Sequence, residues 1–173
     1  MSEYDLIAAC AKGDVIAQRQ LYDKYAGKML GVCLRYAGTR EVARDLLHDG
    51  FIKVFNKIKT YRGEGSFEGW MRKLFVNMAL EYLRKKDALK RYEDYPASIP
   101  AADYSVFEKI SADELVEKIA VLPAGYRAVF NLYAIEGYSH QEIAALLHIS
   151  ESASRSQYSR ARGCLQRMIR GSS

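Results

Sequence analysis

Apolar residues recur at the three- and four-residue spacing of amphipathic helices through the first 92 residues. Glycines and polar capping residues fall between the periodic segments, apart from Gly27 and Gly31. Asp14, Thr39 and Ser66 can each cap a helix N-terminus. The pattern predicts helices over residues 5–12, 14–36, 39–59 and 66–91. Four such helices are expected to form a compact bundle.

The periodic pattern continues after residue 110. Ser111 and Glu114 have the spacing of a capping box, and Pro123 stands where the following helix should begin, which is expected to end at Gly137. Ser139 and Glu142 repeat the capping box before a short helix and a turn at residues 148–150. Ser150 can cap a last helix over residues 151–169. A short helix, a tight turn and a longer helix in series predict a helix-turn-helix, so the fold class is all-α.

Charge divides the chain into three parts. Residues 1–92 hold 18 Lys and Arg against 11 Asp and Glu, residues 93–118 hold 2 against 7, and residues 119–173 hold 6 against 3. Pro96 and Pro100 interrupt any helix in the acidic part. We therefore expect an N-terminal domain (1–92), an acidic, Pro-containing linker (93–110) and a C-terminal domain (111–173). An irregular loop within one domain is the alternative.

Composition narrows the classes of function. The chain has 173 residues and a net charge of +5, and it contains no apolar run near the roughly 20 residues of a membrane span. Its acidic start lacks the features of a secretory signal, so a cytoplasmic protein without membrane insertion is expected. The three Cys and three His residues have no metal-ligand or catalytic-triad spacing, and no phosphate loop is present. We expect no enzyme activity, no catalytic residue, no metal and no cofactor.

The fourth predicted helix combines an apolar stripe with a basic flank. Lys73, Asn77 and Arg84 fall within about 40° of one another on the helical wheel. The cations could hold phosphates and the asparagine could read a base edge. Tyr61, Phe67 and Trp70 could stack on exposed bases, or could belong to the core. The alternative for the whole flank is an ordinary solvated helix face.

The third predicted helix carries acids in an otherwise basic domain. Asp45 and Asp49 lie four residues apart, beside Leu46 and Phe51. DNA would repel this surface, so a protein partner with basic grooves suits it better. Carboxylates that only solvate the helix are the alternative.

The last predicted helix has an apolar side and a basic side. The first contains Ser154, Tyr158, Ala161, Cys164, Leu165 and Met168, which should pack inward. The second contains only uncharged and basic residues: Arg155, Ser156, Ser159, Arg160, Arg162, Gln166 and Arg167. Residues near the N-terminus of a recognition helix reach bases, while Arg162 and Arg167 are better placed for phosphates. A solvated basic helix is the alternative.

These segments together resemble the bacterial RNA polymerase sigma factors of the sigma-70 family, in the extracytoplasmic-function (ECF) subfamily. The resemblance rests on Leu21 to Tyr25, Ala43 to Phe51, Phe67 to Asn77 followed by Tyr82 to Lys85, and Leu122-Pro123 through Arg160-Ala161-Arg162. It implies a region-2-like bundle, a linker and a region-4-like helix-turn-helix domain. It also implies a factor that binds core RNA polymerase and directs promoter-specific transcription initiation.

The resemblance assigns roles to residues. The Asp45-to-Phe51 segment would dock on the polymerase β′ coiled coil, with a further contact to the β flap. Tyr61, Trp70, Lys73, Asn77 and Arg84 would serve the minus-10 element, with Asn77 beside a base turned out of the stack. The minus-35 element would be met by Arg155, Ser156, Gln157, Ser159, Arg160 and Arg162, although the helical wheel does not place Gln157 on the exposed side.

The chain departs from the family pattern at two places. His48 and Gly50 replace the usual glutamine and threonine of the docking segment, and residues 152–157, which include the first recognition positions, replace a pattern nearer Gly-Thr-Val-Lys-Ser-Arg. A weaker or altered DNA preference is one expected consequence. The family's usual regulator is a separate anti-sigma factor, which we expect as a partner. A free-standing helix-turn-helix regulator and a sigma-like decoy for an anti-sigma factor remain alternatives.

Overall fold

The computed structural model describes residues 1–86 and 105–171, which form helices joined by short turns. The N-terminal half contains α1 (Glu3–Ala11), α2 (Val15–Ala37), α3 (Arg40–Lys57), the 3₁₀ turn η1 (Ile58–Thr60) and α4 (Phe67–Lys85). The C-terminal half contains α5 (Ser105–Glu108), α6 (Ala112–Ala120), α7 (Ala124–Phe130), the π-helical segment η3 (Asn131–Ile135), α8 (His140–Leu147) and α9 (Glu151–Gly171). The all-α prediction is confirmed.

The predicted helix starts depend on side-chain caps, and these caps are formed. The Asp14 carboxylate accepts hydrogen bonds from two backbone N–H groups of α2, and Thr39 and Ser66 each accept one at the starts of α3 and α4. Helix α1 begins two residues earlier than predicted, because Ser2 and Asp5 form a capping box. These local bonds satisfy N–H groups that a helix cannot pair internally.

Of the predicted helix ends, one differs in the structure and one lies outside the described residues. The third helix ends at Lys57 and its last predicted residues form η1 instead. The predicted end of the fourth helix at Arg91 lies outside the described residues, as does most of the predicted linker. Helix α5 lies within the predicted linker, so the last part of the linker contains a short helix.

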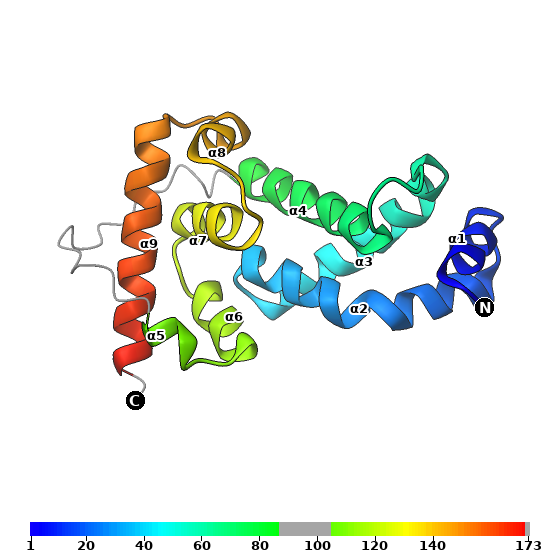
Figure 1. Cartoon of the computed structure of the whole chain (residues 1–173), viewed down its shortest axis with the longest axis horizontal. Coiled ribbons are helices and arrows are strands. Elements are labelled where there is room, and N and C mark those ends of the chain that lie inside the picture. Colours follow the sequence, from blue (N-terminus) through cyan, green and yellow to red (C-terminus); the bar gives the residue numbers. More distant parts are fainter. Residues whose placement is uncertain (87–104, 172–173) are drawn as a thin grey trace.

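Helices α2, α3 and α4 pack around one core, with α1 against the N-terminal part of α2 (Figure 1). Tyr36, Phe67 and Phe75 are buried almost completely in it. Gly50 is required by the packing, since a Cβ at that position would lie 2.0 Å from Cε1 of Phe75. The replacement of a larger residue by Gly50 in α3 therefore has a packing reason.

Helices α6 and α7 pack against α9, which stands across the end of the molecule opposite α1 (Figure 1). A second core forms between them, with Ile119, Leu122, Phe130 and Leu165 buried. Pro123 is the N-cap of α7, as the sequence indicated. The helix continues into η3 and the chain then turns at Gly137, whose φ of 81° favours glycine.

The two halves contact each other through the C-terminal end of α2, the outer side of α4 and the helices α6, α7 and α8 (Figure 1). Leu132, Ile143 and Leu147 are buried in the same apolar cluster as the N-terminal core. Next to them lies a set of buried and partly buried polar residues from both halves, which we call the Glu136 cluster. Its members are Arg35, Arg72, Arg127, Asn131 and Glu136.

Candidate nucleic-acid interface

The basic flank of α4 is exposed, as the helical wheel predicted. Lys73, Asn77 and Arg84 all have exposed side chains on one side of the helix. Lys73 and Asn77 lie at the solvent surface, where cation and amide are available to a ligand. Arg84 differs, because its Nη1 donates a hydrogen bond to the backbone oxygen of Leu146 in α8, at 2.9 Å. This bond joins the flank to the C-terminal half.

An aromatic group lies at the N-terminus of α4. The rings of Phe67 and Trp70 are stacked with centroids 5.4 Å apart, and the ring of Tyr61 lies 5.3 Å from Phe67 and 5.7 Å from Trp70. Phe67 is 1% exposed and belongs to the core, whereas Tyr61 and Trp70 are half-buried. Of the three rings proposed for stacking, only those of Tyr61 and Trp70 are therefore accessible to bases.

The loop before α4 holds Tyr61 in place. Its hydroxyl donates to the backbone oxygen of Gly65 at 2.7 Å. Gly63 and Gly65 have φ values of 78° and 73°, a backbone conformation that side chains disfavour. The two glycines thus allow the tight loop that places Tyr61 beside Trp70.

The acidic surface of α3 is smaller than the sequence suggested. Asp45 and Asp49 are exposed on one side of the helix, but Leu46 and Phe51 are 5% and 3% exposed and face the core. Phe51 packs its ring against Tyr22 and Phe75. The exposed apolar neighbour is instead Ile52, at 49%. Sequence reasoning missed Ile52, although an apolar residue three positions after Asp49 was a visible signal.

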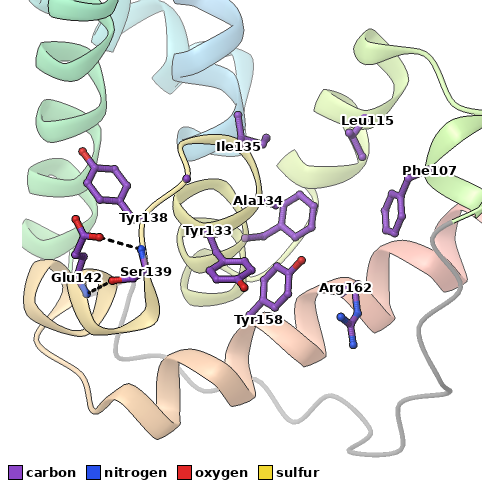
Figure 2. Close-up of a pocket in the computed structure, with 12 residues that line it drawn as sticks. Phe107, Leu115, Tyr133, Ala134, Ile135, Tyr138, Ser139, Glu142, Tyr158 and Arg162 are labelled. Atoms are coloured by element: carbon purple, nitrogen blue, oxygen red, sulfur yellow. Dashed lines mark hydrogen bonds between the residues drawn. The ribbon is translucent and has the colours of Figure 1, made fainter.

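The predicted helix-turn-helix is present as α8, a three-residue turn and α9. Ser139 and Glu142 form the full capping box at the start of α8, drawn as dashed lines in Figure 2. His148 adopts a left-handed conformation with φ 57°, which ends α8. The Ser150 hydroxyl then accepts a hydrogen bond from Ala153 N at 3.0 Å. These bonds cap the helices on both sides of the turn, and the start of α9 packs against α8.

The predicted recognition residues of α9 differ in exposure. Arg155 and Ser156 are exposed, and Ser159 and Arg160 are half-buried. Arg155 forms an ion pair with Glu151 one turn earlier. Arg162 is half-buried and its guanidinium lies 5.6 Å from the centroid of the Tyr158 ring. Exposed cations lie at both ends of α9, with Arg155 near its start and Arg167 and Arg170 near its end.

Three polar side chains of α9 are buried, and one of them, Ser154, was predicted to pack inward. Gln157, proposed for the minus-35 element, is 6% exposed, and Gln166, predicted on the polar side, is 2% exposed. The wheel already placed Gln157 away from the outer side, and the structure agrees with the wheel. At Gln166 the helical wheel was wrong. Helices α6 and α7 pack against α9, and α9 is covered over a wider arc than its apolar residues alone indicate.

An aromatic stack lies close to the turn between α8 and α9, and the sequence did not predict it. The His140 ring lies 4.2 Å from that of Tyr133 at an interplanar angle of 9°, and its Nδ1 is 2.8 Å from the Ser154 hydroxyl. Burial, followed by the positive charge of Arg155, lowers the pKa of His140. The ring thus joins α8, η3 and α9 near the proposed recognition residues.

A cavity of about 770 Å³ lies between η3, the α5–α6 segment and α9. Figure 2 shows Tyr133 and Tyr158 side by side along one part of its wall, with Phe107 and Leu115 along another. The lining is mainly aromatic and aliphatic.

Within residues 1–86 and 105–171, no three His, Cys, Asp or Glu side chains come together as a metal site. In the same residues, no helix combines the length and the apolar character that crossing a bilayer requires.

Comparison with known proteins adds to this geometry. The family model for sigma-70 region 2 matches residues 21–89, and the model for sigma-70 region 4 matches residues 112–165. The chain is 28% identical over 149 residues to the ECF RNA polymerase sigma factor SigE of Mycolicibacterium smegmatis, covering 83% of this chain and 58% of that protein. It is 25% identical over 182 residues to the ECF RNA polymerase sigma-E factor of Haemophilus influenzae, covering 98% and 96%.

A solved structure supports the fold. The sigma factor RpoE of Bartonella quintana, solved in complex with the anti-sigma factor NepR, aligns with a TM-score of 0.51 and 19% identity over 88% of this chain and 96% of that one. The class of protein is a DNA-binding transcription protein. It is indicated by the helix-turn-helix geometry, the exposed basic helix and the second helical unit. The chain belongs to the sigma-70 family, as a sigma factor of the ECF type. Such a factor is not an enzyme; it directs transcription initiation by RNA polymerase.

Proposed function

We propose that this sigma factor recognises two promoter elements with two separate surfaces. The N-terminal half of α9 meets the minus-35 element in the major groove, and the basic flank of α4 meets the minus-10 element. The observation that carries the proposal is the capped helix-turn-helix, in which Arg155, Ser156, Ser159 and Arg160 are exposed or half-buried on α9.

At the minus-35 element, Arg155 and Arg160 are assigned to base edges, and Ser156 and Ser159 to bases or phosphates. A bidentate arginine–guanine contact discriminates against a wrong base by about 1–3 kcal/mol. Arg155 must first leave Glu151, but an exposed ion pair of this kind is worth only about 0–1 kcal/mol, so DNA can outcompete it. Arg162, beside the Tyr158 ring, is assigned to a phosphate. Gln157, being buried, takes an indirect role in orienting α9.

At the minus-10 element, Lys73 is assigned to the DNA backbone and Asn77 to an unstacked base. The half-buried rings of Tyr61 and Trp70 offer the nearby surface on which such a base can stack. Stacking on an aromatic side chain is worth about 1–3 kcal/mol per base, comparable to the cost of turning the base out. Arg84 joins this surface once it releases the Leu146 carbonyl.

The polymerase contact is assigned to Asp45 and Asp49, with Ile52 as its apolar part. The three side chains are exposed on α3. A cationic surface of the β′ coiled coil would complement them, and the C-terminal half would contact the β flap. Leu46 and Phe51 support the helix from the core.

A separate anti-sigma factor is proposed as the regulator, in the cytoplasm. The solved relative from Bartonella quintana is in complex with one. The proposal for this chain rests on that similarity and on the exposed surfaces described above.

The test is transcription by core polymerase with this protein from a library of random promoters, followed by sequencing of the transcribed templates. We expect two enriched elements. Arg155→Ala and Arg160→Ala should each relax the sequence preference at the upstream element and leave the downstream element unchanged. A matched control is Arg19→Ala, which removes an exposed arginine far from α9. Equal losses on every template would assign both arginines to phosphates. If no element were enriched among the transcribed templates, the proposal would be overturned.

A further inference from the structure

The cavity beside α9 has the size and the lining of a small-molecule site. Its volume is about 770 Å³, and ligand pockets in proteins measure roughly 300–1,000 Å³. Such pockets are mostly apolar and aromatic, with a few polar groups that orient the ligand. Apart from Arg162, no residue that the structure places on the wall has a part in the promoter contacts proposed above. Most of the wall is therefore available for a separate role.

Aromatic rings form one part of the wall. The rings of Tyr133 in η3 and Tyr158 in α9 have centroids 4.5 Å apart at an interplanar angle of 55°, and Figure 2 shows them side by side. Phe130 is stacked on Tyr158 at 6.0 Å. Tyr133 remains 39% exposed, although it stands on the wall of a cavity. Aromatic rings attract one another at centroid distances of roughly 4.5–7 Å in tilted or offset geometries. This part of the wall therefore suits a planar aromatic molecule.

The backbone of η3 is shaped toward the cavity. Residues 133–135 all line it, and all belong to the π-helical segment. In an α-helix, three successive side chains spread over about 200°. The π-helical turn is wider and narrows that arc, so the three residues can share one wall. Turns of this kind inside helices are frequent at functional sites.

The charges on the wall are separated. Arg162 is half-buried, and its guanidinium lies 5.6 Å from the centroid of the Tyr158 ring. Glu142 lies at the start of α8, where its carboxylate accepts a hydrogen bond from Ser139 N at 3.2 Å in the capping box. Figure 2 shows Glu142 and Arg162 at opposite ends of the lining. The charge next to the rings is therefore positive, and a guanidinium can hold a carboxylate through two parallel hydrogen bonds.

We propose that this cavity binds a small planar aromatic carboxylate, with its ring against Tyr133 and Tyr158 and its carboxylate on Arg162. A cavity of roughly 150 Å³ in another protein holds benzene, so a volume of about 770 Å³ accommodates at least two fused rings. Arg162 is also assigned above to a DNA phosphate, so a bound carboxylate and promoter DNA would compete for one guanidinium. Binding of the carboxylate does not itself depend on the promoter function.

The experiment is two-dimensional NMR of the full chain, labelled with a nitrogen isotope, during titration with naphthoate. Two matched probes separate the two parts of the site. Naphthylmethanol keeps the fused rings without the charge, and cyclohexanecarboxylate keeps the charge without an aromatic ring. We expect saturable shifts of the backbone signals of residues 133–138 and 158–162 with naphthoate. The dissociation constants of both matched probes should be about tenfold higher.

Two variants test the assigned contacts. Arg162→Gln removes the cation, so it should weaken naphthoate binding about tenfold and leave naphthylmethanol binding unchanged. Tyr133→Leu removes an exposed ring, so it should weaken binding of both naphthyl probes about fivefold. Arg170→Gln changes an exposed arginine near the end of α9 that does not line the cavity, and it is the control. Circular dichroism checks the helix content of each variant, and Tyr133→Leu alone decides if Arg162→Gln does not fold.

The site would be overturned by naphthoate shifts that do not saturate or that fall away from the cavity. Equal affinities for naphthoate and naphthylmethanol, or naphthoate binding that neither variant weakens, would overturn the assigned contacts. All titrations are done without DNA and without polymerase. Their outcome is therefore independent of the promoter proposal, which the library experiment tests separately.

Discussion

The guanidinium of Arg127 offers the sharpest test of how the two halves stabilise each other. Arg127 is 8% exposed and donates short hydrogen bonds to two backbone oxygens, that of Tyr36 and that of Leu122, each at 2.8 Å. The variant Arg127→Met removes these donors and keeps an unbranched side chain of similar length. The loss should therefore report on the charged group rather than on packing.

The magnitude follows from two opposing effects. Each hydrogen bond from a charged donor contributes about 1.5–3 kcal/mol net, so the two short bonds set an upper range of about 3–6 kcal/mol. Burial lowers the pKa of Arg127 to about 10, which means that the cation is costly to hold in the fold. Methionine does not incur this cost, so we expect a loss of about 3 kcal/mol in the free energy of unfolding.

The assay is urea unfolding followed by circular dichroism and by tyrosine fluorescence, whose transitions must coincide for a single free energy to be meaningful. Arg127→Lys should show an intermediate loss, because an ammonium cannot serve the two carbonyls in the fork geometry of a guanidinium. Arg19→Met, on an exposed arginine, is the matched control and should change little. A loss below about 1 kcal/mol in Arg127→Met would refute this account of the α2 terminus.

Three further predictions concern single groups. The Tyr25 hydroxyl donates to the carboxylate of Glu3 and lowers its pKa, so Tyr25→Phe should raise the Glu3 pKa toward 4.5 in an NMR titration; an unchanged value would contradict this. The pKa of His140 lies below 6.5 in the fold because of burial, so the unfolded chain is protonated first and stability should fall as the pH drops below 6.5; His140→Gln should weaken that dependence, and an identical pH profile would count against it. The double variant Asp45→Arg/Asp49→Arg should capture core polymerase about tenfold less well or worse, because like charges would face each other, while duplex binding is kept or increased; capture at the wild-type level would reject the docking surface.

The helix starts could be predicted because their cause is local. Asp14, Thr39, Ser66 and Ser139 each accept a backbone hydrogen bond from a residue two or three positions later, so the signal lies within four residues. The same reasoning would have found the true start of α1. Ser2 and Asp5 have the capping-box spacing, although the prediction began that helix at Asp5.

The surfaces were predicted less well, because exposure depends on neighbours that a single helix does not reveal. A wheel places Asp45 and Asp49 on one side of α3, but it cannot show that Phe51 packs against Tyr22 and Phe75. Gln166 is buried for the same reason, since helices distant in sequence cover it. Sequence spacing therefore gave the chemistry of each surface more reliably than its extent.

The Glu136 cluster lay beyond sequence reasoning for a geometric reason. Its bonds join residues more than 60 positions apart, such as Arg72 with Glu136 and Arg35 with Asn131. Within the C-terminal half, Asn131 and Glu136 are five residues apart, which in an α-helix places side chains about 140° from each other. The π-helical segment η3 closes a wider turn instead, with Glu136 N donating to the Asn131 oxygen at 2.9 Å. That wider turn brings both side chains to the same side, where both reach Arg35. A helical period of 3.6 residues would have separated them, so their shared contact with Arg35 depends on the π-helical segment.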